Sequence, residues 1–429
     1  MSKALKNKEY PYFETDDEII EFLIDELREV LDFMYSVNNT ELKELVEEHV
    51  VEYAKQHKLS SIRMQTIVDR MYNAFRGLGV LQPLLDNPNI TEIMINTFDE
   101  VFVEEDGAVY KTDIRFENVQ KLEDTIQSIV SKVNRVVNES SPIVDARLED
   151  GSRVNVVLPP IALKGPAMTI RKFPANPMTA QDLLNYGAIT EEVVDFIQEL
   201  VEAKYNIFIG GGTGSGKTTF LNVLSNFIPK DERILTIEDS AELQIRNVPN
   251  LVTLETRNAN TQGEGAISIK QLIRASLRMR PTRVIVGEVR GEEALDMLQA
   301  MNTGHDGSLS TGHANSVYDM LSRLETMVLS AAELPIEVIR SQISSAIDIM
   351  IHLSRFRDNS RKVVEVSEIV GVQDGKVELN PLYQFVEEGE DHRGKILGSL
   401  KPTGNAMRNV TKLEVAGKKE LAIKYSTGR

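Results

Sequence analysis

The glycine-rich run GGGTGSGKTT at residues 210–219 constrains the fold of this 429-residue chain more than any other feature. It follows the apolar stretch YNIFIG (205–210) and precedes the apolar stretch FLNVLSNFI (220–228), so the sequence predicts a buried strand, a tight turn and a helix in direct succession. Two glycines separated by four residues and followed by Lys and Thr give the spacing of a phosphate-binding loop, or P-loop. A glycine turn that binds nothing is the alternative.

The chemistry of phosphate binding explains the composition of this loop. Glycines let the backbone bend around a phosphate, so that successive N–H groups and the N-terminus of the next helix point at it. Lys217 is predicted to bridge the terminal phosphates, and Thr218 to offer its hydroxyl to Mg²⁺. ATP and Mg²⁺ are therefore the predicted ligands. The residues predicted to bind the nucleotide here are Gly211, Gly212, Thr213, Gly214, Ser215, Gly216, Lys217, Thr218 and Thr219.

Nucleotide hydrolysis also needs a carboxylate at the end of a neighbouring strand. The stretch TRVIVGEVR (282–290) has an apolar core that predicts a buried strand, and Glu288 stands at its C-terminal end. Many P-loop enzymes carry an acid directly before this Glu, but here that position is Gly287. Other carboxylates are therefore expected to share the work of holding the metal.

A second acidic stretch, ILTIEDSAEL (234–243), offers such carboxylates. Another buried strand is predicted to end at Glu238, and Glu242 lies on the following turn. An alternative is that Asp239 or Ser240 is a helix N-cap, and both roles can hold together. The residues predicted to hold Mg²⁺, with the carboxylates acting through water, are Thr218, Glu238 and Glu288.

Two of the chain's six histidines, His305 and His313, lie in the stretch TGHDGSLSTGHANS (303–316). Two histidines without a cysteine make an incomplete zinc site, so a metal-binding role is the weaker alternative. A strand over SLSTGHA beside the strand of Glu288 would bring His313 near the nucleotide. We therefore predict that His313 and His305 sense the γ-phosphate or position water.

Arginines are expected as well, because the charge on a transferring phosphate has to be stabilised. One group lies before the P-loop, and a second group flanks the strand of Glu288. An arginine on a hairpin is usually a solvated surface residue, which is the alternative for the first group. The two groups are Arg147, Arg153 and Arg171, and Arg278, Arg280, Arg283 and Arg290.

The pattern of apolar residues divides the chain into segments. Helical spacing at the front gives way to short β-rich runs and then to the α/β pattern around the P-loop, so the predicted fold class is α/β. The tail, rich in Gly and Lys, is expected to be partly ordered at best. The segments are an acidic helical bundle (1–78), a mixed α/β domain (79–173), a linker or hinge (174–182), a second α/β domain (183–387) and a C-terminal tail (388–429).

Composition excludes several classes of function. The chain has no cysteine, which rules out disulfides, thiolate metal sites and cysteine nucleophiles. No apolar run is long enough to span a membrane, and the start lacks the apolar core of a signal peptide, so a cytoplasmic protein is expected. The net charge of −17 disfavours nucleic acid as a partner. Residues 1–60 hold 15 acidic and 7 basic residues, which indicates a solvated face or, alternatively, a docking face.

The motifs GGTGSGKTT, TIEDSAEL and RASLRMRPTRVIVGEVRGEEALDMLQAMNTGHDGSLSTGHANS, in this order, resemble those of the ATPase superfamily of bacterial type II and type IV secretion and type IV pili. DARLEDGSRVNVVLPP, TIRKF and SRLETMVL resemble the CpaF/TadA-type ATPases of tight-adherence (Tad) pili. The absence of a four-cysteine zinc module and of a retraction-type helix motif, and the leading helical segment, favour this branch. The resemblance covers residues from about 65 to 385.

This resemblance implies a fold, an activity and partners. It implies a RecA-like P-loop ATPase domain behind a PAS-like α/β domain, in a homo-hexamer that works on inner-membrane platform proteins without spanning the membrane. It assigns Glu288 as the catalytic acid, Glu238 and Glu242 to an Asp box, and His305 and His313 to a His box. Arg153 and Arg171, with Arg147 as a companion, are implied to face nucleotide phosphates. Thr282 stands where the family usually has Asp, so a salt bridge from this position is not expected.

Three other functions remain open at this stage. The first is a conjugation-type secretion ATPase that drives substrate export. The second is a scaffold that binds nucleotide without hydrolysing it, and the third is a RecA-type helicase. Glu288 and the two histidines argue against the scaffold, and the net charge of −17 argues against a strand-binding channel.

Overall fold

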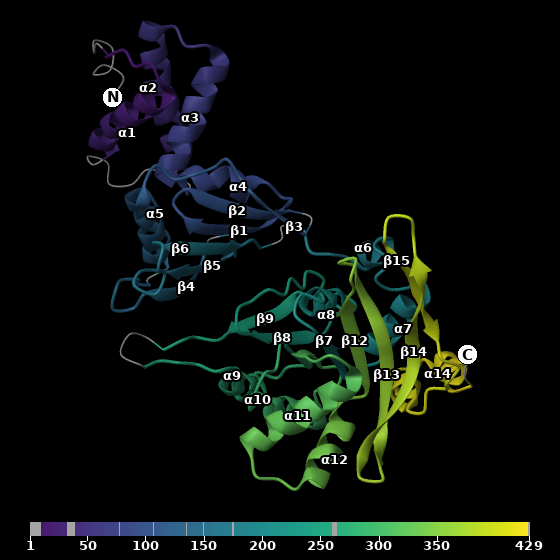
Figure 1. Ribbon diagram of the computed structural model, residues 1–429. Coiled ribbons are helices and arrows are strands. Elements are labelled where there is room, and N and C mark those ends of the chain that lie inside the picture. Colours follow the sequence, from purple (N-terminus) through teal and green to yellow (C-terminus); the bar gives the residue numbers. More distant parts are fainter. Residues whose placement is uncertain are drawn as a thin grey trace. The chain divides into compact units, whose positions relative to one another are not determined.

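The computed structural model describes residues 10–31, 39–76, 78–105, 107–133, 135–148, 150–173, 176–259 and 264–427. The chain forms two compact units, Met1–Ala175 and Asn176–Arg429 (Figure 1). Residues 174–175 of the predicted linker lie outside the described residues. Within the described ranges, no helix has both the length and the apolar run that crossing a membrane requires.

The first unit opens with three helices whose apolar residues recur at helical spacing. Leu23 and Leu27 of the first helix and Val46 and Val50 of the second are fully buried in their common core. Ion pairs join Asp16 and Asp17 to arginines of the third helix, so part of the acidic face is neutralised within the unit. The helices are α1 (Asp16–Leu31), α2 (Asn39–His57) and α3 (Ser61–Arg76).

A six-stranded antiparallel sheet follows, with the order β3-β2-β1-β6-β5-β4. Alternate residues of its strands pack against one another and against α5 in a second core. Helix α5 begins after Asn118, whose side chain accepts from the N–H of Lys121, and it ends at Lys132. The elements are η2 (Gly79–Leu81), α4 (Gln82–Asp86), β1 (Ile90–Thr97), β2 (Glu100–Glu105), β3 (Ala108–Lys111), α5 (Val119–Lys132), β4 (Ile143–Arg147), β5 (Arg153–Val157) and β6 (Ala167–Arg171).

The second unit is built on a nine-stranded sheet with the order β15-β14-β13-β12-β7-β11-β10-β8-β9. The five pairings from β12 to β9 in this order are parallel. The three pairings at the β15 end, from β15 to β12, are antiparallel. The strands are β7 (Ile207–Gly211), β8 (Arg233–Glu238), β9 (Asn250–Glu255), β10 (Arg283–Val286), β11 (Leu309–His313), β12 (Ile349–Arg355), β13 (Arg361–Gln373), β14 (Lys376–Glu390) and β15 (Ile396–Pro402).

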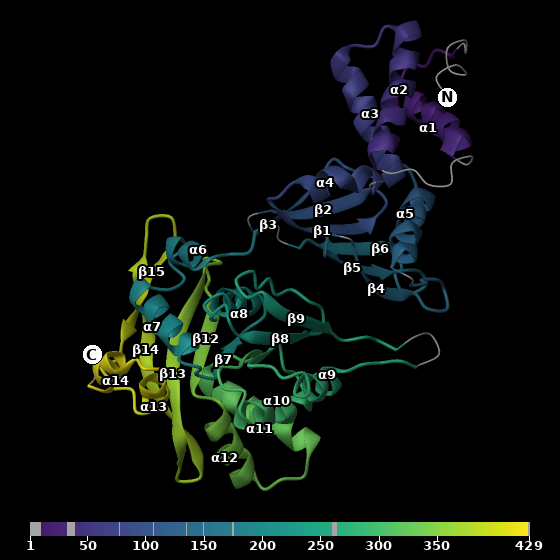
Figure 2. The same ribbon diagram turned by 180° about the vertical axis from the view of Figure 1, so that it is seen from behind.

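Helices cover both faces of this sheet, as parallel strands require. Helices α7 and α8 share one core with the C-terminal segment, and α9 to α12 share the other. Helices α10 to α12 lie in front in Figure 1, and α7 lies in front in Figure 2. The helices are α6 (Ala180–Asn185), α7 (Glu191–Glu202), α8 (Lys217–Ser225), α9 (Ile269–Ser276), α10 (Glu293–Asn302), α11 (Val317–Ala331), α12 (Ile336–Ala346), α13 (Thr411–Val415) and α14 (Lys419–Ser426).

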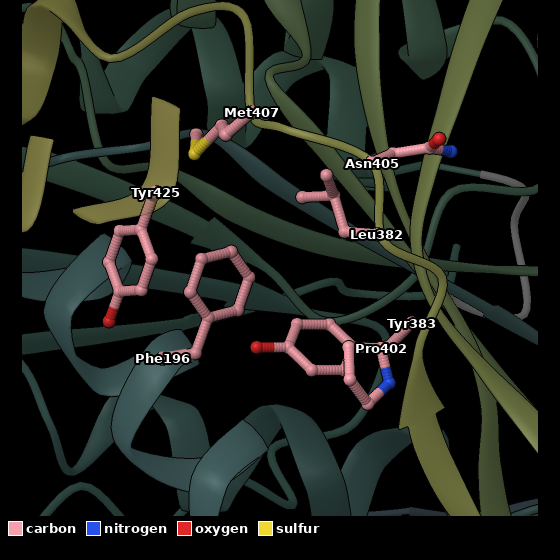
Figure 3. Close-up of a pocket in the computed structure, with 7 residues that line it drawn as sticks. All are labelled: Phe196, Leu382, Tyr383, Pro402, Asn405, Met407 and Tyr425. Carbon is pink, nitrogen blue, oxygen red and sulfur yellow. The ribbon is translucent and has the colours of Figure 1, made fainter. Parts of the chain in front are cut away.

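The C-terminal segment corrects one expectation. The expectation that residues 388–429 are partly ordered at best is wrong, because β15, α13 and α14 form there and pack into the core. Leu413 is fully buried, and the ring of Tyr425 meets that of Phe196 edge-on at 4.9 Å between centroids. With Tyr383, these rings line a small hollow that contains none of the predicted site residues (Figure 3).

Candidate nucleotide site

The P-loop has the backbone that phosphate binding requires. Gly214 and Gly216 have φ angles of +69° and +92°, a region that L side chains rarely adopt. A Cβ added at Gly211 would lie 2.5 Å from Ser215 Oγ and 2.6 Å from Leu353 O. The loop leads from buried strand β7 into α8, whose first residue is Lys217. Three glycines are thus required by geometry, and the helix N-terminus faces the loop.

Lys217 fits a phosphate ligand by its surroundings. Its residue is 7% exposed, and its Nζ donates to Gly212 O at 3.0 Å and lies 3.2 Å from His313 Nδ1. Burial lowers the pKa of Lys217, which the charge of Glu288 opposes. Among the described residues, no carboxylate forms an ion pair with this ammonium. A buried cation held only by a carbonyl and an imidazole is suited to receive an anion.

Glu288 and His313 meet at the carboxyl end of neighbouring parallel strands. Strand β10 lies beside β11, and β11 lies beside β7, with His313 opposite Gly211. His313 Nε2 lies 2.7 Å from Glu288 Oε1, although Oε1 accepts no hydrogen bond of good geometry among the described residues. The predicted approach of His313 to the P-loop and to Glu288 is therefore present in the structure.

The protonation of His313 follows from its neighbours. Burial lowers the pKa of His313, and the charge of Lys217 lowers it further, while Glu288 acts in the opposite direction. The imidazole is therefore neutral near pH 7. Because Lys217 Nζ can only donate, His313 Nδ1 has to accept, and this tautomer carries its proton on Nε2, toward Glu288.

Arg290 holds the other oxygen of Glu288. Its Nη2 and Nε donate to Glu288 Oε2 at 2.7 and 2.9 Å, and its Nη1 donates to Asp239 Oδ2 at 3.2 Å. These contacts raise the pKa of Arg290. The carboxylate of Glu288 is thus fixed on one side by a guanidinium, while its buried Oε1 remains open to a donor such as water.

The side chain of Glu238 is buried and is held by backbone N–H groups. It is 3% exposed, and its Oε1 accepts from the N–H groups of Glu242 and Leu243 at 2.9 and 3.2 Å. A Cβ added at Gly287 would lie 2.8 Å from Glu238 Cγ. The side chain of Glu238 therefore occupies the space that an acid at position 287 would need, which explains the glycine there.

The alternative that Asp239 or Ser240 is a helix N-cap is wrong. Residues 240–247 follow β8 without forming a helix. The segment is held instead by Glu238 and by Asn222 of α8, whose Oδ1 accepts from the N–H of Gln244 at 2.8 Å. Glu242 lies in this segment and is half-buried.

His305 and His313 are not brought together. His313 is the last residue of β11 (Leu309–His313), and His305 lies before the strand begins. Because a strand rises by about 3.3 Å per residue, the length of β11 separates the two histidines. His305 Nδ1 lies 3.2 Å from Ala300 O at the end of α10. The structure thus places His313 at the P-loop end of β11 and His305 at the other end.

The three arginines predicted from the first unit form one row. Arg147 is opposite Arg153 on β4 and β5, and Arg153 is opposite Arg171 on β5 and β6. Residues opposite each other in an antiparallel sheet share a face, and like charges placed so repel. The three arginines thus lie together in the sheet, and their role in facing nucleotide phosphates stays a prediction.

The arginines around β10 serve different purposes. Arg283 is fully buried, donates to both oxygens of Glu232 at 2.6 and 2.7 Å, and also donates to Val201 O. It is therefore a structural ion pair rather than a phosphate ligand. Thr282 stands where the family usually has Asp. Its Oγ1 accepts from the N–H of Arg233 at 3.1 Å, so a neutral hydrogen bond forms at this position.

Sequence reasoning missed one residue at the loop. Arg361 Nε donates to Gly214 O at 2.8 Å. The arginine-rich stretch SRFRDNSRK (354–362) was a signal, but its place beside the P-loop depends on the pairing of β12 with β7, which the local pattern does not reveal.

Comparison with known proteins assigns the family. The profile described as "Type II/IV secretion system protein" matches residues 75–396. The chain belongs to this family. A putative conjugal transfer protein of Mycobacterium tuberculosis is 33% identical over 70% of this chain and 87% of its own length. The type IV secretion system protein VirB11 of Brucella suis is 32% identical over 64% of this chain and 84% of its own length.

A solved structure supports the architecture of this family member. The crystal structure of the pilus retraction motor PilT with bound ADP covers 81% of this chain and 89% of its own, with a TM-score of 0.50 and 20% identity. The likeness concerns the fold alone. It confirms the predicted combination of a mixed α/β unit and a RecA-like ATPase unit.

Proposed function

We propose that the chain is a Mg²⁺-dependent ATPase that drives a secretion or pilus machine. The observation that carries the proposal is the buried Lys217 beside His313 and Glu288, all at the carboxyl ends of parallel strands. In open α/β sheets, this edge is where ligands bind. Family membership supports the same activity.

The proposed reaction is in-line attack of water on the γ-phosphate: the water oxygen bonds to the γ-phosphorus, the bond to the bridging oxygen breaks, ADP leaves, and the proton of water ends on the released phosphate. Lys217 and the loop amides hold the β- and γ-phosphates, and Glu288 orients the water through its open Oε1. Neutral His313 keeps its Nε2 beside this oxygen at 2.7 Å, while Arg290 holds Oε2 and so fixes the direction of the carboxylate. Mg²⁺ would be held by the Thr218 hydroxyl and, through water, by Glu238 and Glu288, and it neutralises phosphate charge.

Arginines complete the proposed site. The row formed by Arg147, Arg153 and Arg171 supplies positive charge that stabilises the transferring phosphate. Closure of the first unit on the second, around the stretch 174–182, would couple hydrolysis to movement. The proposed assembly is a homo-hexamer at the inner face of the cell membrane, bound there through platform proteins.

Two machines fit this activity. The motifs DARLEDGSRVNVVLPP, TIRKF and SRLETMVL favour assembly, with or without retraction, of a Tad pilus. Two relatives are named as a putative conjugal transfer protein and as VirB11 of a type IV secretion system. These names favour type IV secretion, with export of a substrate, as strongly as the motifs favour the Tad pilus. Deletion of the gene, followed by electron microscopy for pili and by a conjugation assay, separates them.

The activity is tested by measuring phosphate release against protein concentration, with mass photometry on the same samples. We expect turnover to rise as a six-subunit species appears, and Glu288→Gln to abolish turnover while that species persists. Glu420→Gln, which removes an exposed carboxylate of α14, is the matched control. Turnover by a monomer would contradict the ring, no turnover by wild type would favour the scaffold, and stimulation by DNA would favour the helicase.

A further inference from the structure

Strand β13 begins beside the P-loop. Strand β12 pairs in parallel with β7, which places Leu353 opposite Gly211, and the following turn brings Arg361 opposite Arg355. From this position Arg361 Nε donates to Gly214 O at 2.8 Å. The P-loop thus receives a side-chain contact from a residue 147 positions further along the chain.

Arg361 contacts the carbonyl oxygen of Gly214, which has to point away from the phosphate when the loop binds it. In a nest of successive amides, the N–H groups point inward to the anion and the carbonyl oxygens point away from it. Gly214 adopts a φ of +69°, and with no side chain it is free to leave this conformation. A charged hydrogen bond from Arg361 opposes that rotation.

The next residue of β13 reaches the opposite side. Successive side chains of a strand point to opposite faces. Lys362 is 6% exposed, and its Nζ donates to Gly187 O at 3.0 Å, while the N–H of Val363 donates to Ala188 O at 2.9 Å. The start of β13 therefore holds the P-loop on one side and the turn between α6 and α7 on the other.

The turn that carries these residues is itself well fixed. Asp358 accepts from the N–H and Oγ of Ser360 and from the N–H of Ile396. Burial raises the pKa of Asp358, but these hydrogen bonds outweigh it and lower the pKa to about 2. Arg355 Nη2 donates to Asn359 Oδ1 at 2.8 Å in the same turn. Because this turn is held by hydrogen bonds, Arg361 is held in place and can oppose a movement of Gly214.

We propose that Arg361 is a positioning residue of the P-loop, and that Arg361 and Lys362 together couple nucleotide binding to the α6–α7 turn. The inference rests on the proposed nucleotide site and adds a coupling that the site residues do not contain. Helix α6 begins four residues after the start of the second unit, so the turn lies on the stretch through which the chain enters from the first unit. Order in the P-loop would thus be transmitted to the turn that follows α6, the helix in which the predicted linker ends.

The positioning role is tested by titrating the full chain with a fluorescent ADP analogue and Mg²⁺. We expect Arg361→Ala to weaken binding about tenfold, the effect of losing one charged hydrogen bond, and to raise KM for ATP more than it lowers kcat. Arg361→Lys keeps a donor and recovers part of the affinity. Arg393→Ala, which removes an exposed arginine from the turn before β15, is the matched control and binds as wild type does.

The coupling is tested by hydrogen exchange with and without saturating Mg-ADP. In wild type, ADP slows exchange in the P-loop, at Val363 and in residues 183–188. In Arg361→Ala, saturating ADP still protects the P-loop but no longer protects the other two regions. In Lys362→Met, which keeps the apolar stem, affinity for ADP stays within about twofold and protection of 183–188 is lost.

Each outcome decides one of the two ideas. Wild type that binds no nucleotide would contradict the proposed function and the inference together. Wild type that binds ADP while Arg361→Ala binds it equally well would overturn the inference alone. A fall in the melting temperature of nucleotide-free Arg361→Ala that accounts for the lost affinity would assign Arg361 a structural role and also overturn it.

Discussion

Gly287 is the residue whose small size matters most to the candidate site. An added methyl group would lie 2.8 Å from Glu238 Cγ and 3.4 Å from its Oε1. Glu238 would then have to move and release the two backbone N–H groups that it accepts from residues 242 and 243. The glycine is therefore coupled to the order of the whole segment after β8.

We expect Gly287→Ala to lower ATPase turnover at least tenfold and to destabilise the second unit by about 1–3 kcal/mol. Phosphate release and urea unfolding measure the two effects. Gly291→Ala is the control, since a Cβ there meets only Glu293 Oε2 at 3.5 Å, an ordinary contact. Equal behaviour of the two variants would show that Glu238 moves at no cost.

His352 gives the second unit a dependence on pH. Its Nδ1 is buried without a hydrogen-bond partner among the described residues, and burial lowers the pKa of His352 below that of an unfolded chain. Between the pKa of His352 in the folded chain and its pKa in the unfolded chain, the unfolded chain binds more protons. The contribution of His352 to the free energy of unfolding is therefore complete above about pH 6.5 and falls as the pH drops below this value. We expect a smaller fall in melting temperature from pH 7.5 to 5.5 in His352→Gln than in wild type.

At the scale of elements, the C-terminal segment is part of the core. Leu413 of α13 is fully buried, whereas Val415 on the same short helix is 84% exposed. Leu413→Ala should therefore cost about 2–5 kcal/mol through lost burial and the cavity left behind. Val415→Ala should change the free energy of unfolding by less than about 0.5 kcal/mol. Urea unfolding of both variants compares them, and equal effects would contradict the packing of α13.

The same elements show what the sequence can and cannot predict. The P-loop, the strand of Glu288 and the strand of His313 were predictable because each motif is local and the periodicity around it is strong. The packing of α13 and α14 was missed because frequent Gly and Lys conceal apolar residues at Leu413 and Tyr425. The contact of Arg361 with Gly214 was missed because it depends on a strand pairing between distant parts of the chain.

At the scale of the whole molecule, the open question is whose arginines serve each site. The row of Arg147, Arg153 and Arg171 lies in the first unit, and the P-loop lies in the second. Arg171 ends β6, and α6 begins at Ala180, so the eight residues between them can span at most about 30 Å. In a ring of the proposed kind, the row that serves a P-loop belongs either to the same chain or to a neighbouring chain.

Mixing two inactive variants decides between one chain and two. Arg153→Ala and Glu288→Gln each remove one part of the site, and we expect each to lose turnover on its own. If both parts come from one chain, mixed rings contain no complete site, and we expect the mixture to stay inactive. If the arginines come from a neighbouring chain, about one interface in four of a randomly mixed ring is complete, and turnover returns in proportion. Mass photometry with a size-tagged variant confirms that the rings have mixed, so recovered turnover would assign the arginine row to the neighbour.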